Sequence, residues 1–292
     1  MSSAARTSAI ASVPERRASA GLWSHAWYRL RRDKVTMGAF AVLAVMVLLS
    51  AAAPLFSQYV FQWRFEQQNL LGADEIGRSQ VVRLLYGGQV SLMVGFFAAM
   101  VNLTLGVTIG LTAGYLRGRV DDFFTWVITT LNSIPAIFLL LIIATLFTPG
   151  PLTLIIVIGA LLWTGISLFV RGQTFALRER EFITAAKTIG ASTPRIMFRH
   201  ILPNVLPLII ILSAIDIGVV ILIESALSYL GLGIAPPTPS WGNMLTNASQ
   251  YFVRAWWLVI PPGFMIFLTV LCLYLIGDGL RDALDPRLKG GH

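Results

Sequence analysis

Two carboxylates, Asp216 and Glu224, are the side chains best placed for polar chemistry in an apolar setting. They lie in the same apolar stretch of the sequence. There an ionised carboxylate costs at least about 2.5–3.5 kcal/mol on insertion scales, so it has to face a helix-bundle interior or a wet cavity. We expect Asp216 either to line a polar pathway or to fix helix packing. Glu224, near the end of the stretch, is expected to belong to a gate.

Enzymatic or metal chemistry finds little support in the residue types. His25, His200 and His292 are far apart, and Cys272 is the only cysteine, which leaves no cysteine-based metal cluster and no intrachain disulfide. The sequence has no His-Glu-x-x-His pattern and no Gly-x-x-x-x-Gly-Lys-Ser/Thr phosphate loop. We therefore predict no catalytic residue, no metal site and no nucleotide site on this chain.

A polar segment, residues 171–204, separates two apolar stretches and carries six cations against Glu179 and Glu181. The cations are Arg171, Arg178, Arg180, Lys187, Arg195 and Arg199. Neither glycine nor proline occurs from Phe175 to Ile189, which predicts one helix over that range. The segment reads as a docking handle on one side of a membrane.

The glycine, hydroxyl and proline residues of this segment predict a turn between two helices. Gly190 is a helix stop, because glycine readily adopts the conformation that ends a helix. Ser192 or Thr193 can cap a second helix with Pro194 at its first position, where a missing N–H costs nothing. Pro203 is expected to end that second helix at the membrane.

The composition indicates an integral membrane protein. Of 292 residues 56% are hydrophobic and only 12% are charged, and the mean hydropathy is +0.74. Soluble domains carry about 25% charged residues, so this chain cannot cover itself with a polar surface. The net charge of +8 comes from cations beside apolar stretches, which is typical of membrane topology rather than nucleic-acid binding.

Six apolar stretches are long enough to cross a bilayer, which predicts an all-α protein with six transmembrane helices. They are 37–56, 90–114, two stretches between 123 and 170 that Thr148–Pro151 separates, 206–223 and 255–277. A cleaved signal peptide ending near residue 53 is the alternative for the first, but its polar leader and apolar core are too long. Residues 1–20 are expected to lack fixed structure.

The connecting segments carry further predictions. Gly72 and Gly77 bracket a turn before the second span. Residues 22–34 mix aromatic and cationic side chains and suit a membrane surface. Residues 225–252 hold no charge but contain prolines and glycines, so they are not a lipid-exposed helix and are expected to pack into the protein. Asn102 and Asn132 are weaker pathway candidates, with packing the more common role.

The distribution of cations predicts the orientation of the chain in the membrane. With six spans, 18 of the 22 Lys and Arg residues fall on the side of the two termini and of segment 171–204, and four fall on the other. Cytoplasmic loops carry the excess of positive charge, so both termini and the polar segment are predicted to be cytoplasmic.

The polar segment also resembles a known motif. Thr184-Ala185-Ala186, Gly190 and Leu202-Pro203 keep the spacing of the EAA loop of ABC importer permeases. The sequence departs from the family at Thr184, where glutamate is common, and at His200. The resemblance implies that this segment couples the chain to a separate ATPase. The residues so implied are Glu181, Thr184, Ala185, Ala186, Gly190, Ala191, Leu202 and Pro203.

Three further stretches narrow the resemblance to dipeptide and oligopeptide permeases of the C type: 71–87, 224–242 and 277–287. Ser79 and Gln89 replace charged residues expected there. The resemblance implies a type I ABC importer transmembrane domain in a bacterial inner membrane that forms half of a peptide pathway. Nickel or another small solute is the alternative cargo, because related permeases share these motifs.

The implied partners follow from the same resemblance. They are a second homologous permease subunit, one or two ATPase subunits that hold ATP and Mg, an extracytoplasmic binding protein that Glu224 or residues 225–252 could touch, the peptide and membrane lipid. No cofactor is expected on this chain and no nucleic acid. A rival from the residues alone is a proton-coupled secondary transporter in which Asp216 relays protons, but no internal repeat is evident.

The expected organisation has four parts. Residues 1–34 form a cytoplasmic tail, and 35–88 form the first transmembrane helix with an external segment. Residues 89–278 form the permease domain, with the coupling loop 171–204 inside it. Residues 279–292 form a second cytoplasmic tail.

Overall fold

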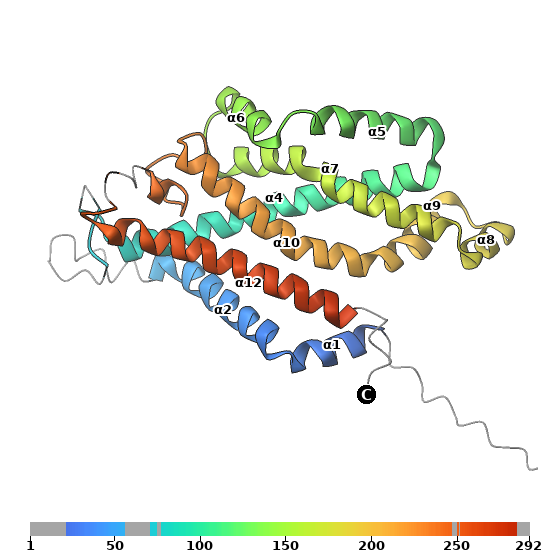
Figure 1. Ribbon diagram of the computed structural model, residues 1–292, viewed down its shortest axis with the longest axis horizontal. Helices are drawn as coiled ribbons and strands as arrows, with labels where there is room; N and C mark the ends of the chain where they lie inside the picture. Colours follow the sequence, from blue (N-terminus) through green and yellow to red (C-terminus); the bar gives the residue numbers. More distant parts are fainter. Residues whose placement is uncertain (1–21, 56–70, 75–76, 247–249, 251, 285–292) are drawn as a thin grey trace, which may run out of the picture.

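The computed structural model describes residues 22–55, 71–74, 77–246, 250 and 252–284. Within these ranges the chain is helical, and its only β feature is an isolated bridge between Ala73 and Ser79. The expectations for residues 1–20 and for most of the tail 279–292 lie outside the described residues. Figure 1 shows the long helices lying side by side along the molecule, with α8 and α9 at one end.

The helices are bounded as follows: α1 Leu22–Arg32, α2 Lys34–Ala51, α4 Gln80–Leu116, α5 Gly118–Asn132, α6 Ala136–Leu146, α7 Pro151–Arg178, α8 Glu181–Thr188, α9 Thr193–Ile196, α10 Leu202–Tyr229 and α12 Ile260–Leu284. A π-helical turn, Met197–Ile201, joins α9 to α10, and 3-10 turns lie at Asn243–Leu245 and Trp256–Leu258.

Five helical segments of the described chain are long and apolar enough to cross a membrane, and the pair α5–α6 makes up to six. This agrees with the predicted all-α membrane fold. The third span differs from expectation, because α5 and α6 meet at 84° instead of forming one straight helix. The break precedes Pro135, whose ring disfavours helical geometry in the preceding residue.

Some helices extend beyond the apolar stretches from which they were predicted. α4 has 37 residues and is about 55 Å long, well beyond the ~30 Å of a hydrocarbon core. Its first turns carry Gln80 and Arg83 because they pack on other protein segments rather than on lipid. α12 begins at Ile260 rather than 255 and continues to Leu284, so the tail predicted from residue 279 is helical at its start.

α4 is the central helix and packs most closely on α7. Gly106, Gly110 and Gly114 form a stripe of small residues at intervals of four along α4. A Cβ added at any of the three would lie within 2.8 Å of an α7 atom. The missing side chains therefore let the two backbones approach, as the small residues of this stretch predicted.

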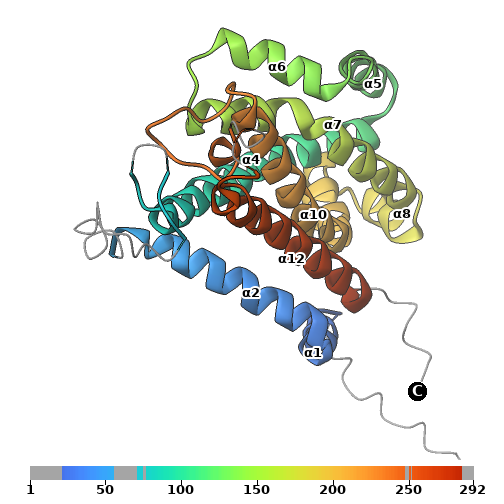
Figure 2. The ribbon, with the colours of Figure 1, turned by 60° about the vertical axis from the view of Figure 1, so that its left-hand side comes forward.

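The remaining helices flank this pair. α10 packs on α4 and α12, and α2 packs on α12 and α4, while Figure 2 shows α5 and α6 on the side opposite α1 and α2. α1 is a short surface helix within the predicted tail 1–34, and its Ala26 and Leu30 pack on Ala283 and Leu284 of α12.

Asp33 separates α1 from α2 and caps α2. Its carboxylate accepts a hydrogen bond from the Val35 N–H at 3.0 Å and another from the Thr36 hydroxyl. The Thr36 hydroxyl is the main reason that the pKa of Asp33 lies below its usual value. The first span therefore starts at a fixed point, three residues earlier than predicted.

The turn predicted between Gly72 and Gly77 is confirmed. Both glycines have positive φ, +70° and +78°, and the Gly77 N–H donates to the Asp74 carbonyl. The Asp74 carboxylate accepts bonds from the Arg78 and Arg83 side chains at 2.7 Å. Burial raises the pKa of Asp74, but the Arg78 hydrogen bonds and the two cationic charges outweigh it and lower the pKa overall.

Candidate functional site

The polar segment folds into a short helical hairpin at one end of the molecule, residues 181–196, which we call the coupling hairpin (Figure 1). The continuous helix predicted from Phe175 to Ile189 is wrong, because α7 ends at Arg178 and α8 starts at Glu181. Arg180 is extended, and the Glu179 carboxylate pairs with Arg117 at 2.6 Å. A tertiary ion pair thus accompanies the break, which local propensity cannot reveal.

The stop at Gly190 is confirmed. Gly190 has φ +82°, its N–H donates to the Lys187 carbonyl at 2.9 Å, and the Ala191 N–H donates to the Ala186 carbonyl at 3.0 Å. These two bonds form a Schellman motif, which satisfies carbonyls left free at the end of α8. The turn therefore depends on a left-handed residue at position 190.

The second helix begins at Thr193, with Ser192 at the cap position. The Ser192 side chain makes no capping bond, and Pro194 is the second helical residue, not the first as predicted. Pro203 does not end this helix, which is a second correction: the chain stays helical from Thr193 to Tyr229. In the π turn the Leu202 N–H bonds to the Met197 carbonyl, and this wider turn carries the helix past the proline.

The coupling hairpin has a packed face and an open face. Ile183 and Ala186 of α8 are buried in the core formed with α4, α7 and the start of α10. Of the predicted coupling residues, Ala191 and Leu202 are half-buried at its edge, while Glu181, Thr184, Ala185, Gly190 and Pro203 are exposed. An alanine at 186 allows α8 to approach closely, which explains part of the motif.

Three large apolar side chains on the open face were not singled out from the sequence. Ile189 is 85% exposed, Phe198 is 61% exposed and Phe182 is 45% exposed. The sequence did offer one indication of this exposed apolar surface: Ile189 is a bulky apolar residue beside Gly190 in an otherwise polar turn. Exposed bulky apolar side chains in a protruding hairpin and in the turn that follows it are typical of a protein contact.

α7, which leads into the hairpin, is fastened to the end of α4 and to the start of α5. The Tyr115 carbonyl accepts a bond from Arg178 at 2.6 Å, and Lys187 lies 5.6 Å from the Tyr115 ring centre. Arg171 pairs with Asp121 through both guanidinium nitrogens facing it. Arg178 and Arg171 thus fix the end of α7 against α4 and α5, while in the hairpin itself Lys187 lies over the Tyr115 ring of α4.

Two of the four pathway candidates, Asp216 and Asn102, lie at the α4–α10 contact. The Asn102 side-chain nitrogen lies 2.8 Å from each oxygen of the Asp216 carboxylate, joining α4 to α10. Asn102 is fully buried and Asp216 is half-buried. Among the described residues no lysine, arginine or histidine forms an ion pair with Asp216.

The structure does not bring the other two candidates to this pair. Glu224 is fully buried and accepts bonds from the hydroxyls of Ser91 and Ser228. Its side chain has no exposed surface with which to touch another protein. Asn132 is exposed and accepts a bond from Thr164 of α7 at 2.9 Å, so it ties α5 to α7.

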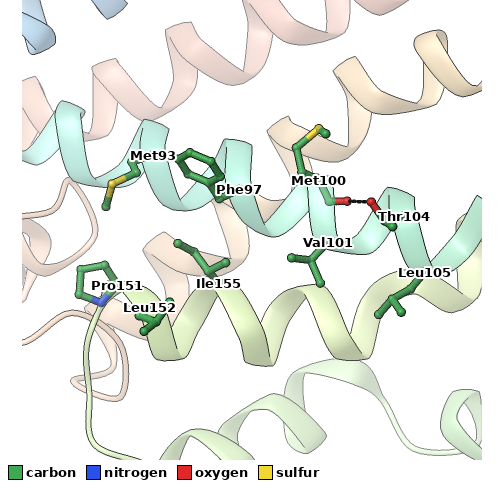
Figure 3. Close-up of a pocket in the computed structure, with 9 residues that line it drawn as sticks. All are labelled: Met93, Phe97, Met100, Val101, Thr104, Leu105, Pro151, Leu152 and Ile155. Atoms are coloured by element: carbon green, nitrogen blue, oxygen red, sulfur yellow. Dashed lines mark hydrogen bonds between the residues drawn. The ribbon is translucent and has the colours of Figure 1, made fainter.

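A groove of about 830 Å³ runs between α4 and α7. Figure 3 shows its lining: Met93, Phe97, Met100, Val101, Thr104, Leu105, Pro151, Leu152 and Ile155. Its one hydroxyl, on Thr104, donates to the Met100 carbonyl at 2.7 Å. None of the four pathway candidates lines the groove, which therefore offers apolar contact only.

The family model described as binding-protein-dependent transport system inner membrane component matches residues 106–290. The chain belongs to this family. A second model, the N-terminal TM domain of oligopeptide transport permease C, matches residues 21–74 of this transport component. The resemblance drawn from the EAA-like loop is thereby confirmed.

Named relatives span nearly the whole transport component. It is 38% identical to the oligopeptide transport system permease protein OppC of Escherichia coli strain K12, over 91% of each chain. It is 36% identical to OppC of Haemophilus influenzae, over 91% of this chain and 89% of the relative. It is 35% identical to the dipeptide transport system permease protein DppC of Bacillus subtilis, over 94% and 88%.

A solved structure supports the same fold. The transport component aligns with a chain of the MetNI methionine ABC transporter in inward facing conformations, with a TM-score of 0.54. The alignment covers 69% of this chain and 96% of the other at 16% identity, so it bears on the fold alone. The family model, the named relatives and the apolar helices together make the transport component a multi-pass bacterial inner-membrane permease subunit.

Proposed function

We propose that this permease forms half of the translocation pathway of an ATP-driven importer for dipeptides or oligopeptides. The observation that carries the proposal is the coupling hairpin, which is seated on α4 and presents exposed apolar side chains at the end of the molecule. The names of the relatives support the peptide substrate. Nickel or another small solute is the cargo to be distinguished from it.

The proposed partner at the hairpin is a separate ATPase that holds ATP and Mg²⁺. Ile189, Phe182 and Phe198 would enter a groove on that ATPase, with Glu181, Thr184, Ala185, Gly190 and Pro203 around them, while Ala186, Ala191 and Leu202 support the packed side. Apolar packing supplies the contact, which makes the family's glutamate at position 184 dispensable. The remaining partners are a second permease subunit and an extracytoplasmic binding protein.

The pathway assignment is also a proposal. Asp216 and Asn102 form a polar point on the α4–α10 contact, and Asp216 is only partly buried there. A partly buried carboxylate within a span suits a wet pathway shared with the second subunit. Asn132 and Glu224 contribute to packing in this proposal and line no pathway.

The proposed orientation places both ends of the chain and the coupling loop 171–204 in the cytoplasm. Its support is the distribution of cations along the sequence. A reporter that is active only in the cytoplasm should be active when inserted beside Thr188 and inactive when inserted beside Pro237. Both positions are exposed, so the insertions should leave the fold intact. The opposite pattern would reverse the orientation and remove the basis of the ATPase contact.

Reconstitution tests the function itself. The permease, purified with its partner subunits in vesicles and supplied with the binding protein, should accumulate a labelled tripeptide only when ATP is present. A matched reaction with a non-hydrolysable ATP analogue is the control. Uptake of nickel ions but not of peptide would assign the other cargo, and uptake driven by a proton gradient in the permease alone would contradict the ATPase proposal.

A further inference from the structure

The segment that follows α10, residues 231–246, is folded into the protein, and we call it the outer loop. Trp241 is fully buried, and its indole N–H donates to the Leu84 carbonyl of α4 at 3.0 Å. Gly88 of α4 makes room for it, since a Cβ there would lie 2.8 Å from the Trp241 ring. The outer loop is therefore seated on α4 rather than exposed to solvent along its length.

The outer loop keeps its shape through its own hydrogen bonds. The Asn243 side-chain amide donates to the carbonyls of Ile234 and Thr238, at 3.0 and 2.8 Å. Its oxygen accepts a bond from the Ser240 N–H at 3.0 Å. These three bonds lie within the outer loop and fix its internal shape. Other contacts attach the loop to the helices.

Glu224 is at the centre of that attachment. Its carboxyl group accepts hydrogen bonds from the hydroxyls of Ser91 on α4, at 2.9 Å, and Ser228 on α10, at 2.8 Å. Each serine oxygen also accepts a backbone N–H of the outer loop: Trp241 bonds to Ser91 at 3.2 Å, and Ile234 bonds to Ser228 at 3.0 Å. One buried carboxyl group thus orients two hydroxyls that hold the outer loop at two points.

The same helix reaches the coupling hairpin at its other end. The chain is helical from Thr193 through the π turn to Tyr229, and Glu224 lies near the outer end of this run. Figure 1 shows the outer loop and the coupling hairpin at opposite ends of the molecule. A displacement of α9 therefore moves the helix that carries Glu224.

We propose that Glu224 is a positioning residue that fastens the outer loop to α4 and α10 through Ser91 and Ser228. Movement of the coupling hairpin is then carried along α10 to the outer end of the permease, where the outer loop moves with the helix. Glu224 acts without touching substrate, because its side chain is fully buried. The transport part of this inference rests on the proposed function, whereas the attachment of the outer loop does not.

The attachment is tested by cysteine accessibility. Cys272, the single cysteine, is replaced by serine, and Met244→Cys places a reporter in the outer loop where the native side chain is only 8% exposed. Reaction with a membrane-impermeant maleimide is then timed in intact cells. Ser91→Ala and Ser228→Ala should each raise the rate about tenfold, because each removes the hydroxyl that accepts an outer-loop N–H while donating to Glu224.

Ser225→Ala is the matched control. Ser225 is a buried serine next to Glu224, but its hydroxyl is 3.4 Å from the carboxyl group and holds no backbone N–H of the outer loop in the described structure. The rate should not change in this variant. In vesicles that contain the full complex, Ser91→Ala and Ser228→Ala should lose most peptide uptake while the ATPase still co-purifies, and Ser225→Ala should transport normally.

Each outcome bears on the inference. Unchanged maleimide rates in both alanine variants would overturn the attachment. Raised rates with normal uptake would overturn the positioning role. Loss of both variants from the membrane beside a stable Ser225→Ala would also count against it, because the serines would then serve folding. If the unsubstituted complex fails to take up peptide, the proposed function fails, and the maleimide rates still decide the attachment.

Discussion

Replacing Gly190 with valine is expected to reduce ATP-driven uptake at least about tenfold while the permease remains in the membrane. Gly190 has φ +82°, and a side chain in this left-handed region costs roughly 1–2 kcal/mol, more when it is β-branched. A Cβ at Gly190 would meet no atom within 4 Å, so crowding plays no part. The backbone at the turn would shift and displace Ile189, which is the most exposed apolar residue at the proposed ATPase contact.

Two variants test this cause. Gly172→Val is the matched control, because Gly172 is also exposed with open space around its Cβ position but has no positive φ. It should keep most uptake. Gly190→Asn should recover much of what valine loses, since asparagine tolerates the left-handed region. Peptide accumulated per ATP hydrolysed is the quantity to measure, and equal values for Gly190→Val and the unsubstituted complex would refute the coupling role.

Gly190 could be predicted because its signal is local. A glycine after a helical run ends a helix wherever the rest of the chain goes, and the same holds for the turn between Gly72 and Gly77. The membrane class and five of the spans were predictable for a similar reason, since a long charge-free stretch can be recognised without knowing what it packs against. The break at Glu179 was not predictable, because its contact with Arg117 joins residues 62 positions apart.

Two prolines were interpreted wrongly from the sequence: a helix end was predicted at Pro203, and no break was predicted at Pro135. Pro203 looked like a helix end, but the π turn before it and the burial of Ile201 and Val205 keep the helix continuous. Pro135 lay in an apolar run and was passed over, yet α5 and α6 bend by 84° there. The effect of a proline depends on how its neighbours rebuild the backbone bonds, which the sequence does not show.

For the site residues, too, local features were predictable and long-range contacts were not. Asp216 and Asn102 were recognisable as polar residues in apolar stretches, but their contact spans 114 positions and emerged only from the fold. Glu224 was recognisable too, yet its assignment to a gate missed that two serines from α4 and α10 enclose it. Residue type thus identified the unusual groups, whereas their partners depend on how α4 lies against α10.

The second large effect is expected at Asn102. Asn102→Leu keeps the number and branching of the side-chain heavy atoms but removes the amide that donates to Asp216. No cationic partner of Asp216 exists among the described residues, so its carboxylate would be left without its donor in a span. A hydrogen bond to a charged group contributes about 1.5–3 kcal/mol to stability. We expect a large fall in the thermal midpoint of the purified permease.

Adding a second substitution shows whether the lower stability comes from the lost hydrogen-bond donor or from poorer packing. In Asn102→Leu combined with Asp216→Leu both polar groups are gone, and stability should return close to that of the native chain, because replacing both partners of a buried pair by apolar groups is often neutral. Asn204→Leu is the control, because Asn204 is exposed near the start of α10 and its amide donates to the His200 carbonyl one turn earlier, so this change should shift the midpoint little. A double variant no more stable than Asn102→Leu would contradict the account.

The double variant also decides between the two roles expected of Asp216. If the pair only fixes the packing of α4 on α10, the stable double variant transports peptide normally in vesicles. If Asp216 lines the pathway, uptake falls although stability has returned, because the polar point on the route is gone. The half-buried position of Asp216 favours the second result, since a carboxylate needed only for packing would gain nothing from its open side.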